Sequence, residues 1–332
     1  MKPVLTADKL RPPGTLAPTA TDGAGRMCPV DYRYAPAELD RRCDFSADVL
    51  YVVGGLYGNA AALDVLDALA AAELQPPAIV LNGDFHWFDA DPDWFSEIER
   101  RVSRYRALRG NVETELARDQ DIGAGCGCTY PESVDDGVVQ RSNDILRALR
   151  GTAAELPGVR GRLARLPMHL VAQVGDLRVG IVHGDAASLA GWRFSHEALD
   201  EGSQRGWLDG VHRASRIDVF ASTHTCLAAL RDLPLPGGRL TVINNGAAGM
   251  PNFTGTQFGL ISRIATSASP HPPLYGMRRD GVHIDAIALT YDVKRFLPRF
   301  LARWPDGSPA HTSYLRRIEY GPDHAIAQAA NG

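Results

Sequence analysis

Short, largely apolar stretches that each end in a cluster of Gly, Asp, Asn or His residues recur along the first two thirds of the chain. Their length and composition predict β-strands. The four stretches are residues 78–81, 105–108, 177–182 and 217–221. Residues just beyond the carboxyl ends of strands converge on one edge of a sheet, where open α/β folds bind their ligands. We therefore expect the polar clusters after these stretches to lie together in one site.

Other apolar patterns predict the rest of the framework. A strand at residues 49–54 precedes a helix at residues 60–73, and further strands are expected at residues 239–243, 258–264 and 282–289. Strands and helices alternate in the first half of the chain, and strands dominate the second half. This order predicts an α/β fold in which two mixed β-sheets pack as a sandwich with helices on both outer faces.

The domain organisation follows from the same pattern. A chain of 332 residues with 45% hydrophobic content can bury one large core, which we place in residues 47–292. Residues 1–46 are expected to form a largely irregular N-terminal extension because they are rich in Pro and Ala. An insertion at about residues 123–161 contains an amphipathic helical pattern, and residues 293–332 form a C-terminal helix and tail.

For two of these segments, we predict whether particular side chains pack on the core or face solvent. Three apolar or aromatic residues of the extension are candidates to dock on the core: Tyr32, Tyr34 and Leu39. The basic residues of the predicted helix at 293–303 recur at helical spacing, and we interpret them as a solvated face: Lys294, Arg295, Arg299 and Arg303.

Composition narrows the partners and the compartment. The net charge of -4 and the pI near 6.2 give no sign of a nucleic-acid-binding surface. Residues 1–26 lack a sustained apolar stretch, so we expect neither a signal peptide nor a membrane anchor, and a cytoplasmic protein. Arginine far outnumbers lysine, as GC-rich bacterial genomes favour, so a phosphate contact outside a metal would come from Arg. The oligomeric state stays open.

The polar clusters contain the ligand types of a divalent metal. They supply one carboxylate, one amide oxygen and two imidazoles, from Asp84, Asn111, His183 and His224. Two His and one carboxylate with open positions are also the ligand set of mononuclear iron(II) enzymes, so the residue types alone leave the reaction open.

The order of the motifs resembles the calcineurin-like metallophosphoesterase superfamily, whose pattern is D-x-H, G-D-x-x-D, G-N-H-E/D, a single H and G-H-x-H. The resemblance spans about residues 48–253 and includes a late turn at residues 244–251. It implies the same two-sheet architecture and metal-dependent phosphoesterase chemistry. In this resemblance, Asp84, Asn111 and the two histidines correspond to the complete ligand set of one of the family's two metals.

The other metal of the family has lost the ligands that belong to it alone. Gly55 stands where the first motif has Asp, Tyr57 stands where it has His, and Cys226 replaces the last His. The resemblance therefore implies a vacated second-metal position and one divalent ion, with Mn, Fe and Zn not distinguishable. We expect no second ion beside the first.

The acid that protonates the family's leaving group is also changed, because Val112 replaces its His. His86 is a candidate general acid, with a surface histidine between two aromatic residues as the alternative. Asp185 and Tyr57 are further candidates to assist the attacking water.

Two residues are candidates to bind substrate. Asn59 is placed to cap the helix at 60–73, whose free N–H groups would hold an anion, although a purely structural cap is equally consistent with the pattern. Arg193 lies with Trp192 in a predicted lid at residues 188–207 and is a candidate phosphate or carboxylate clamp.

Cysteines form a second candidate group. Five cysteines, an odd number, favour reduced thiols. Four of them are candidate ligands of a structural zinc, with ordinary packing residues as the alternative: Cys28, Cys43, Cys126 and Cys128.

Two functional hypotheses of different class remain. In the first, the protein is a hydrolase that uses a single divalent metal to activate water against a small phosphoester or other anionic substrate, without nucleic acid or membrane partners. In the second, it is a catalytically degenerate member of the fold that serves as a binding scaffold. A mononuclear metal enzyme with chemistry other than phosphoester hydrolysis is a variant of the first.

Overall fold

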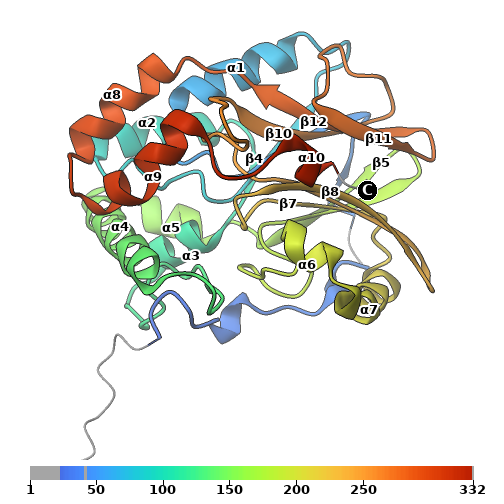
Figure 1. Cartoon of the computed structure of the whole chain (residues 1–332), viewed down its shortest axis with the longest axis horizontal. Coiled ribbons are helices and arrows are strands. Elements are labelled where there is room, and N and C mark those ends of the chain that lie inside the picture. Colours follow the sequence, from blue (N-terminus) through green and yellow to red (C-terminus); the bar gives the residue numbers. More distant parts are fainter. Residues whose placement is uncertain (1–22, 41–42, 331–332) are drawn as a thin grey trace, which may run out of the picture.

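Two six-stranded β-sheets lie face to face in the computed structural model, which describes residues 23–40 and 43–330 (Figure 1). The first sheet has the strand order β11-β12-β10-β2-β3-β4. Its strands are β2 (Val49–Val53), β3 (Ala78–Asn82), β4 (Arg106–Leu108), β10 (Gly259–Ala265), β11 (Tyr275–Arg279) and β12 (Val282–Leu289). The three strands β2, β3 and β4 are parallel, and β10 joins β2 antiparallel.

The second sheet has the order β1-β5-β6-β7-β9-β8. Its strands are β1 (Phe45–Ser46), β5 (His169–Val174), β6 (Leu177–Val182), β7 (Val219–Ser222), β8 (Ala228–Leu235) and β9 (Gly238–Asn245). Here β6, β7 and β9 are parallel, whereas β5 and β8 join antiparallel. Both sheets are therefore mixed, as predicted.

The strand β2 shows why the apolar runs of the sequence lack alternation. Leu50 and Val52 contact the core between the two sheets, whereas Val49, Tyr51 and Val53 contact the helices outside the first sheet. All five residues are buried because both faces of the strand are covered.

Helices cover both outer faces of the sandwich. The core outside the first sheet contains residues of α1 (Ala60–Ala71), α2 (Pro92–Val102), α4 (Asp136–Glu155), α5 (Val159–Ala164), α8 (Val293–Arg303) and α9 (Pro309–Tyr320). The core outside the second sheet contains residues of α6 (His196–Asp200) and α7 (Arg205–Ser215). The short helices α3 (Asn111–Ala117) and α10 (Ile326–Ala329) complete the described fold. This arrangement confirms the predicted fold class.

The described part of the N-terminal extension docks on the core. Tyr32 and Leu39 are fully buried and Tyr34 is 7% exposed, next to two short 3₁₀ turns, Val30–Tyr32 and Pro36–Glu38. The predicted docking of these three side chains is confirmed. Residues 1–22, which the prediction of an irregular extension also covers, lie outside the described residues, as do residues 41–42.

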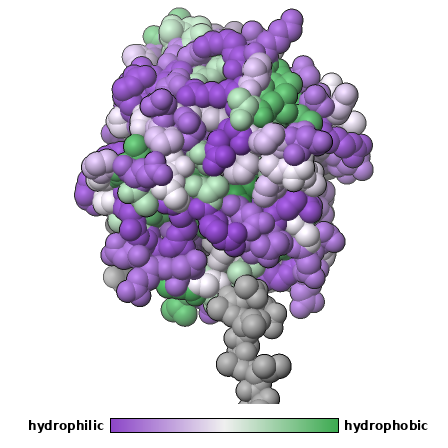
Figure 2. All heavy atoms as spheres, turned by 90° about the vertical axis from the view of Figure 1, so that its left-hand side faces the viewer, coloured by the Kyte–Doolittle hydropathy of each residue, from purple (hydrophilic) through white to green (hydrophobic). Residues whose placement is uncertain are grey.

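The C-terminal helices extend beyond the single helix that the sequence predicts. In α8, Phe296 and Phe300 are buried, whereas Lys294 and Arg295 are exposed. The face that carries α8 and α4 is mostly hydrophilic, with apolar residues in small separate groups (Figure 2). The tail predicted after α8 contains α9, which packs against α4 of the insertion. Among the helices of the described ranges, none has the length and apolar character needed to cross a membrane.

Candidate functional site

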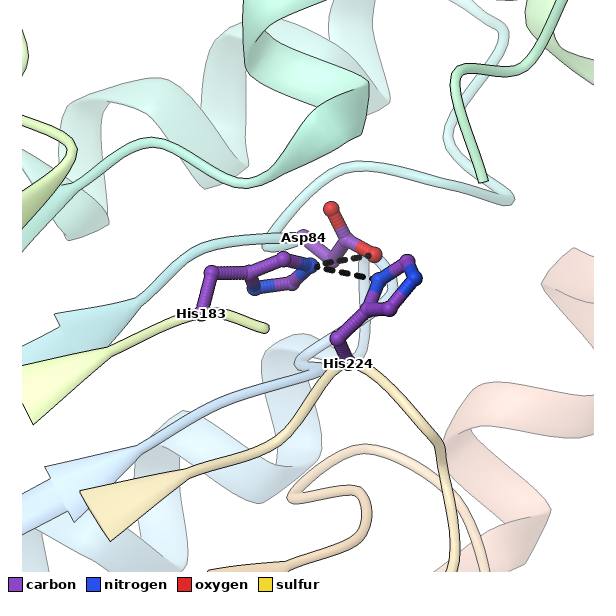
Figure 3. Close-up of side chains that lie close together, drawn as sticks. All are labelled: Asp84, His183 and His224. Atoms are coloured by element: carbon purple, nitrogen blue, oxygen red, sulfur yellow. Dashed lines mark hydrogen bonds and ion pairs between the residues drawn. The ribbon is translucent and has the colours of Figure 1, made fainter. Parts of the chain in front are cut away.

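Three loops from the two sheets meet at one edge of the sandwich. Asp84 follows β3 of the first sheet, whereas His183 and His224 follow β6 and β7 of the second. Their side chains point toward one another (Figure 3). Asn111, at the start of α3 after β4, joins them. The structure thus brings together all four residues that the sequence singled out as metal ligands.

The ligand atoms lie within reach of one cation. His183 Nε2 is 3.1 Å from Asn111 Oδ1, 3.1 Å from His224 Nδ1 and 3.4 Å from Asp84 Oδ2. Ligand atoms of the Asp and the two His all lie within 4.8 Å of one another. Donors bound to one metal at about 2.0 to 2.2 Å have separations of this size.

The outer atoms of these side chains are held by backbone carbonyls. His183 Nδ1 donates to the carbonyl of Asn82 at 2.8 Å, and His224 Nε2 donates to that of Cys128 at 2.9 Å. Asn111 Nδ2 donates to the carbonyl of Cys126 at 2.9 Å. Because a carbonyl only accepts, these contacts place the N–H of each neutral imidazole on the outer nitrogen. Two imidazole lone pairs, an amide oxygen and a carboxylate then face one another.

The pKa shifts of the two histidines run in opposite directions. Burial, followed by the charge of His183, lowers the pKa of His224 to about 4, so His224 stays neutral and keeps a lone pair on Nδ1. Burial opposes the charged form of His183, but the adjacent Asp84 carboxylate outweighs it and raises that pKa. Neutral imidazole is the form that binds metals.

Two glycines allow the loops to approach this closely. A Cβ on Gly110 would lie 2.2 Å from Asp84 Oδ1 and 2.7 Å from His183 Cε1. A Cβ on Gly83 would lie 2.5 Å from the Gly110 nitrogen, and Gly83 has a φ of 79°. Gly83 and Gly110 are therefore needed for these loops to contact each other.

Glu113 is a structural carboxylate behind the site. It accepts backbone N–H groups of Asp84 at 2.8 Å, Gly110 at 2.9 Å and Phe85 at 3.1 Å. Burial, followed by the charge of Asp84, raises its pKa to about 7. Its place in the Gly-Asn-Val-Glu motif was the signal that could have identified it.

Protein side chains fill the predicted vacated second-metal position. The Tyr57 ring lies over Gly55, where a Cβ would be 3.0 Å from the Tyr57 hydroxyl. That hydroxyl lies 2.9 Å from Cys226 Sγ. Burial raises the pKa of both the phenol and the thiol, so both groups are neutral and satisfy each other.

His86 is not at the site, and its proposed role as general acid is wrong. It is fully buried, with Nδ1 at 2.5 Å from Asp89, Nε2 at 3.1 Å from Glu99 and its ring stacked on Phe95. The surface location considered as an alternative is wrong as well. Both ring nitrogens bind carboxylates and neither is available to a substrate.

Asp185 is likewise structural. Its buried carboxylate accepts the backbone N–H groups of Ala187, Ser188 and Arg193, which shape the loop after His183. It does not line the pocket beside the candidate ligands, so the prediction that it assists catalysis is contradicted.

The two predicted substrate-binding residues also lie elsewhere. Asn59 caps α1, accepting from the Ala62 N–H and donating to the Gly249 carbonyl, and the purely structural alternative holds. Arg193 is exposed and stacks on Trp207 at 4.7 Å, away from the pocket.

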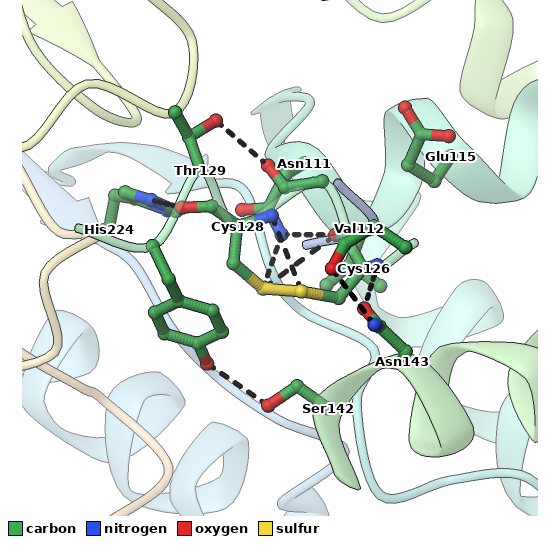
Figure 4. The surroundings of a disulfide bond; sticks show 12 residues. Asn111, Val112, Glu115, Cys126, Cys128, Thr129, Ser142, Asn143 and His224 are labelled. Carbon is green, nitrogen blue, oxygen red and sulfur yellow. Dashed lines mark hydrogen bonds between the residues drawn. A yellow bond between two sulfur atoms is a disulfide. The ribbon is translucent and has the colours of Figure 1, made fainter. Parts of the chain in front are cut away.

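The four cysteines do not form a zinc site. Cys126 and Cys128 form a disulfide next to Asn111 (Figure 4). Cys28 and Cys43 are free thiols. Within the described ranges, the only group of three or more potential metal-binding His, Cys, Asp or Glu side chains is the cluster of Asp84, His183 and His224. The predictions of a zinc site and of fully reduced thiols are therefore wrong.

A pocket of about 150 Å³ opens beside the candidate ligands. Apart from Asp84, Asn111 and His224, its walls include Tyr57, Trp87, Tyr130, Trp192, Tyr314 and Arg317. Only Tyr57 was predicted to take part in catalysis. Trp192 belongs to the predicted lid, but Tyr314 and Arg317 lie on α9, which the sequence did not reveal.

Comparisons with known structures identify proteins with a similar fold. No protein family model and no curated protein sequence matches the chain. A hypothetical protein of Pyrococcus horikoshii superposes with a TM-score of 0.55 and 16% identity, covering 83% of this chain and 99% of its own. The metallophosphoesterase of Sphaerobacter thermophilus superposes with a TM-score of 0.50 and 15% identity, covering 82% of this chain and 100% of its own. The resemblance seen in the motifs is confirmed in three dimensions, and the chain has the metallophosphoesterase fold.

Proposed function

We propose that the protein is a metal-dependent phosphoesterase-like hydrolase with a single divalent ion. Asp84, Asn111, His183 and His224 would hold the ion. The observation that carries the proposal is the convergence of three lone-pair-bearing atoms on His183 Nε2, with another atom of each of the four side chains held by the protein. Such a set of acceptors is stabilised by a cation between them.

The metal ion and the protein residues would have separate roles in the reaction. A divalent ion there would polarise a phosphoryl oxygen and lower the pKa of a water molecule. The backbone carbonyls of Asn82, Cys126 and Cys128 keep the ligands oriented. Of the three residues predicted to assist catalysis, Tyr57 alone lines the pocket, and it remains the candidate to hold a proton near the substrate. Arg317 supplies a positive charge at the pocket wall.

The filled second position favours the alternative, a binding scaffold without catalytic activity. Tyr57 and Cys226 satisfy each other where the family has metal ligands, as expected of a site that has lost its original use. The retained ligand set favours the hydrolase, because four acceptors at this spacing have no structural purpose in a scaffold. Chemistry other than phosphoester hydrolysis uses the same ligands and is separated by the substrate assay below.

Elemental analysis of protein purified without added metal tests the proposal. We expect about one divalent ion per chain, and hydrolysis of a generic aryl phosphomonoester or phosphodiester that is abolished by EDTA and restored by metal. Two well-occupied ions per chain would contradict the single site. Metal-free protein whose melting temperature does not respond to Mn²⁺, Fe²⁺ or Zn²⁺ would support the scaffold.

A further inference from the structure

Apart from the candidate ligands, much of the pocket wall is aromatic. Trp192 lies edge-on to His224, with ring centroids 5.4 Å apart, and contacts Tyr130 at 5.8 Å. Trp87 lies edge-on to Tyr314 at 6.4 Å. These rings come from four separate segments of the chain and surround one space beside the ligand cluster.

The polar tips of two of these side chains are already occupied. Trp192 Nε1 donates to the Cys128 carbonyl at 3.0 Å, and the Tyr130 hydroxyl lies 3.1 Å from Ser142 Oγ. Their rings are thus held in place and are left to contact a ligand through apolar surface. A cavity of about 150 Å³ limits the apolar part of a ligand to about one benzene-sized ring.

Arg317 adds a charge to this apolar space. Its Nη2 donates to the Cys226 carbonyl at 2.6 Å and its Nε to the Pro251 carbonyl at 3.2 Å. No carboxylate of the residues that the structure describes pairs with it. An arginine held only by carbonyls keeps its charge for an anion. The pocket therefore combines room for one ring with attraction for a negative group.

The surroundings also limit the leaving group. Val112 lines the pocket at the position of the family's acid, and both nitrogens of His86 are engaged by carboxylates. The Tyr57 hydroxyl is shared with Cys226. A leaving group that departs as a stabilised anion suits a site with so little acid assistance, and phenolate is such a group.

We propose that the substrate is the phosphate monoester of a phenol, with its single ring between Trp192 and Tyr314 and its phosphoryl group between the ligand cluster and Arg317. This inference rests on the proposed hydrolase function. A water oxygen forms the new bond to phosphorus as the bond from phosphorus to the phenolic oxygen breaks. The phenolic oxygen leaves with the electron pair of the broken bond and accepts a proton from the attacking water, so the products are a phenol and inorganic phosphate.

A non-hydrolysable pair of ligands tests the ring site without turnover. In metal-loaded protein, we expect phenylphosphonate to bind about tenfold more tightly than methylphosphonate, measured by calorimetry and by quenching of tryptophan fluorescence. Tyr314→Ala should reduce this preference several-fold, and Tyr314→Phe should keep it. Arg317→Gln should weaken both ligands by a similar factor.

Metal content separates the two proposals. If wild type and Tyr314→Ala each hold one ion per chain and phenylphosphonate has no advantage over methylphosphonate, the aryl site is wrong while the hydrolase proposal stands. An equal loss of phenyl preference in Tyr314→Phe and Tyr314→Ala would also overturn the ring contact. Protein that binds no metal would overturn both proposals.

Discussion

Two neighbouring positions at the same sheet edge differ in how their polar atoms are paired: the retained position of Asp84, Asn111, His183 and His224, and the filled position of Gly55, Tyr57 and Cys226. At the retained position, Asp84 Oδ2, Asn111 Oδ1 and His224 Nδ1 all lie within 3.4 Å of His183 Nε2. At the other, Tyr57 and Cys226 form a hydrogen bond with each other over Gly55. The first arrangement is completed by a metal ion, as proposed, or by a proton on His183 Nε2, whereas the second is complete without either. The two positions therefore differ in the completeness of their polar contacts rather than in the presence of polar residues.

Substituting one residue at each of the two positions should produce the largest difference in metal affinity and in hydrolysis. His224→Ala removes a ligand and should lower metal affinity by more than about 100-fold, beyond the range seen when only an outer partner is changed. Cys226→Ser should leave metal content unchanged and reduce hydrolysis only mildly. Metal titration and initial rates on an aryl phosphate measure both. The reverse ranking would mean that a cysteine nucleophile carries the chemistry.

The close approach of the loops at the retained position gives the next largest effect. Gly110→Ala should lower the free energy of unfolding by about 1 to 3 kcal/mol and weaken metal binding, because the new Cβ overlaps Asp84. Gly210→Ala in α7 is the matched control, since its Cβ would meet nothing within 4 Å. Urea unfolding of the two variants measures the difference. Equal stabilities would show that the loops can separate without penalty.

The loop of Cys126 and Cys128 should affect only the retained position. Its carbonyls accept from Asn111 and His224, so opening the disulfide should reduce metal affinity by about tenfold, as loss of an outer partner does. Metal titration with and without dithiothreitol measures this. The double variant Cys126→Ser with Cys128→Ser controls for direct chelation by the reductant. Unchanged affinity in both experiments would limit the disulfide to a structural role.

Restoring the second position would sharpen the comparison further. The triple variant Gly55→Asp, Tyr57→His and Cys226→His should bind a second ion, because it returns the ligands that the family resemblance assigns there. Gly55 has a φ of 65°, so the Asp should cost about 1 to 2 kcal/mol of stability. Elemental analysis should give two ions per chain for the triple variant and one for Cys226→His alone. One ion in both would mean that neighbouring residues have closed the position.

Alkaline pH should weaken the ion pairs of His86, which follows Asp84 by two residues but lies away from both positions. Burial alone would lower the pKa of His86, but Asp89 and Glu99 raise it to about 10. A folded pKa above the unfolded value of 6.5 stabilises the protein fully below pH 6.5, and this contribution is lost as pH rises toward 10. Unfolding free energy should fall by about 1 kcal/mol or more between pH 7 and 10, and less in His86→Gln. If the unfolding free energy of wild type and His86→Gln depended on pH in the same way, His86 would not be the cause.

The convergence of the candidate ligands could be predicted from sequence because its signals are local. Asp84, His183 and His224 each follow an apolar run, and the strands β3, β6 and β7 lie within about two residues of the predicted limits. The motif order added the fold, since parallel strands deliver their carboxyl ends to one edge. Capping by Asn59 was also predictable, because a cap acts within one turn of its own helix.

The roles of His86, Asp185 and the cysteines were decided by residues that the motifs do not show. Phe85 and Trp87 beside His86 do not reveal that Glu99, on the later helix α2, faces it. The carboxylate of Asp185 is used by the loop that it begins. Four cysteines permitted zinc, but chain geometry pairs two neighbours and leaves Cys28 and Cys43 as free thiols.

Sequence therefore determined which residues a metal would use, whereas tertiary structure decided what surrounds them. Tyr314 and Arg317 reach the pocket from α9, more than two hundred residues after Asp84. Apolar periodicity identifies the strand from which a ligand emerges because it reflects burial along one element. The wall opposite that ligand depends on how distant elements pack against each other, and such packing arises only when the whole chain closes around its core.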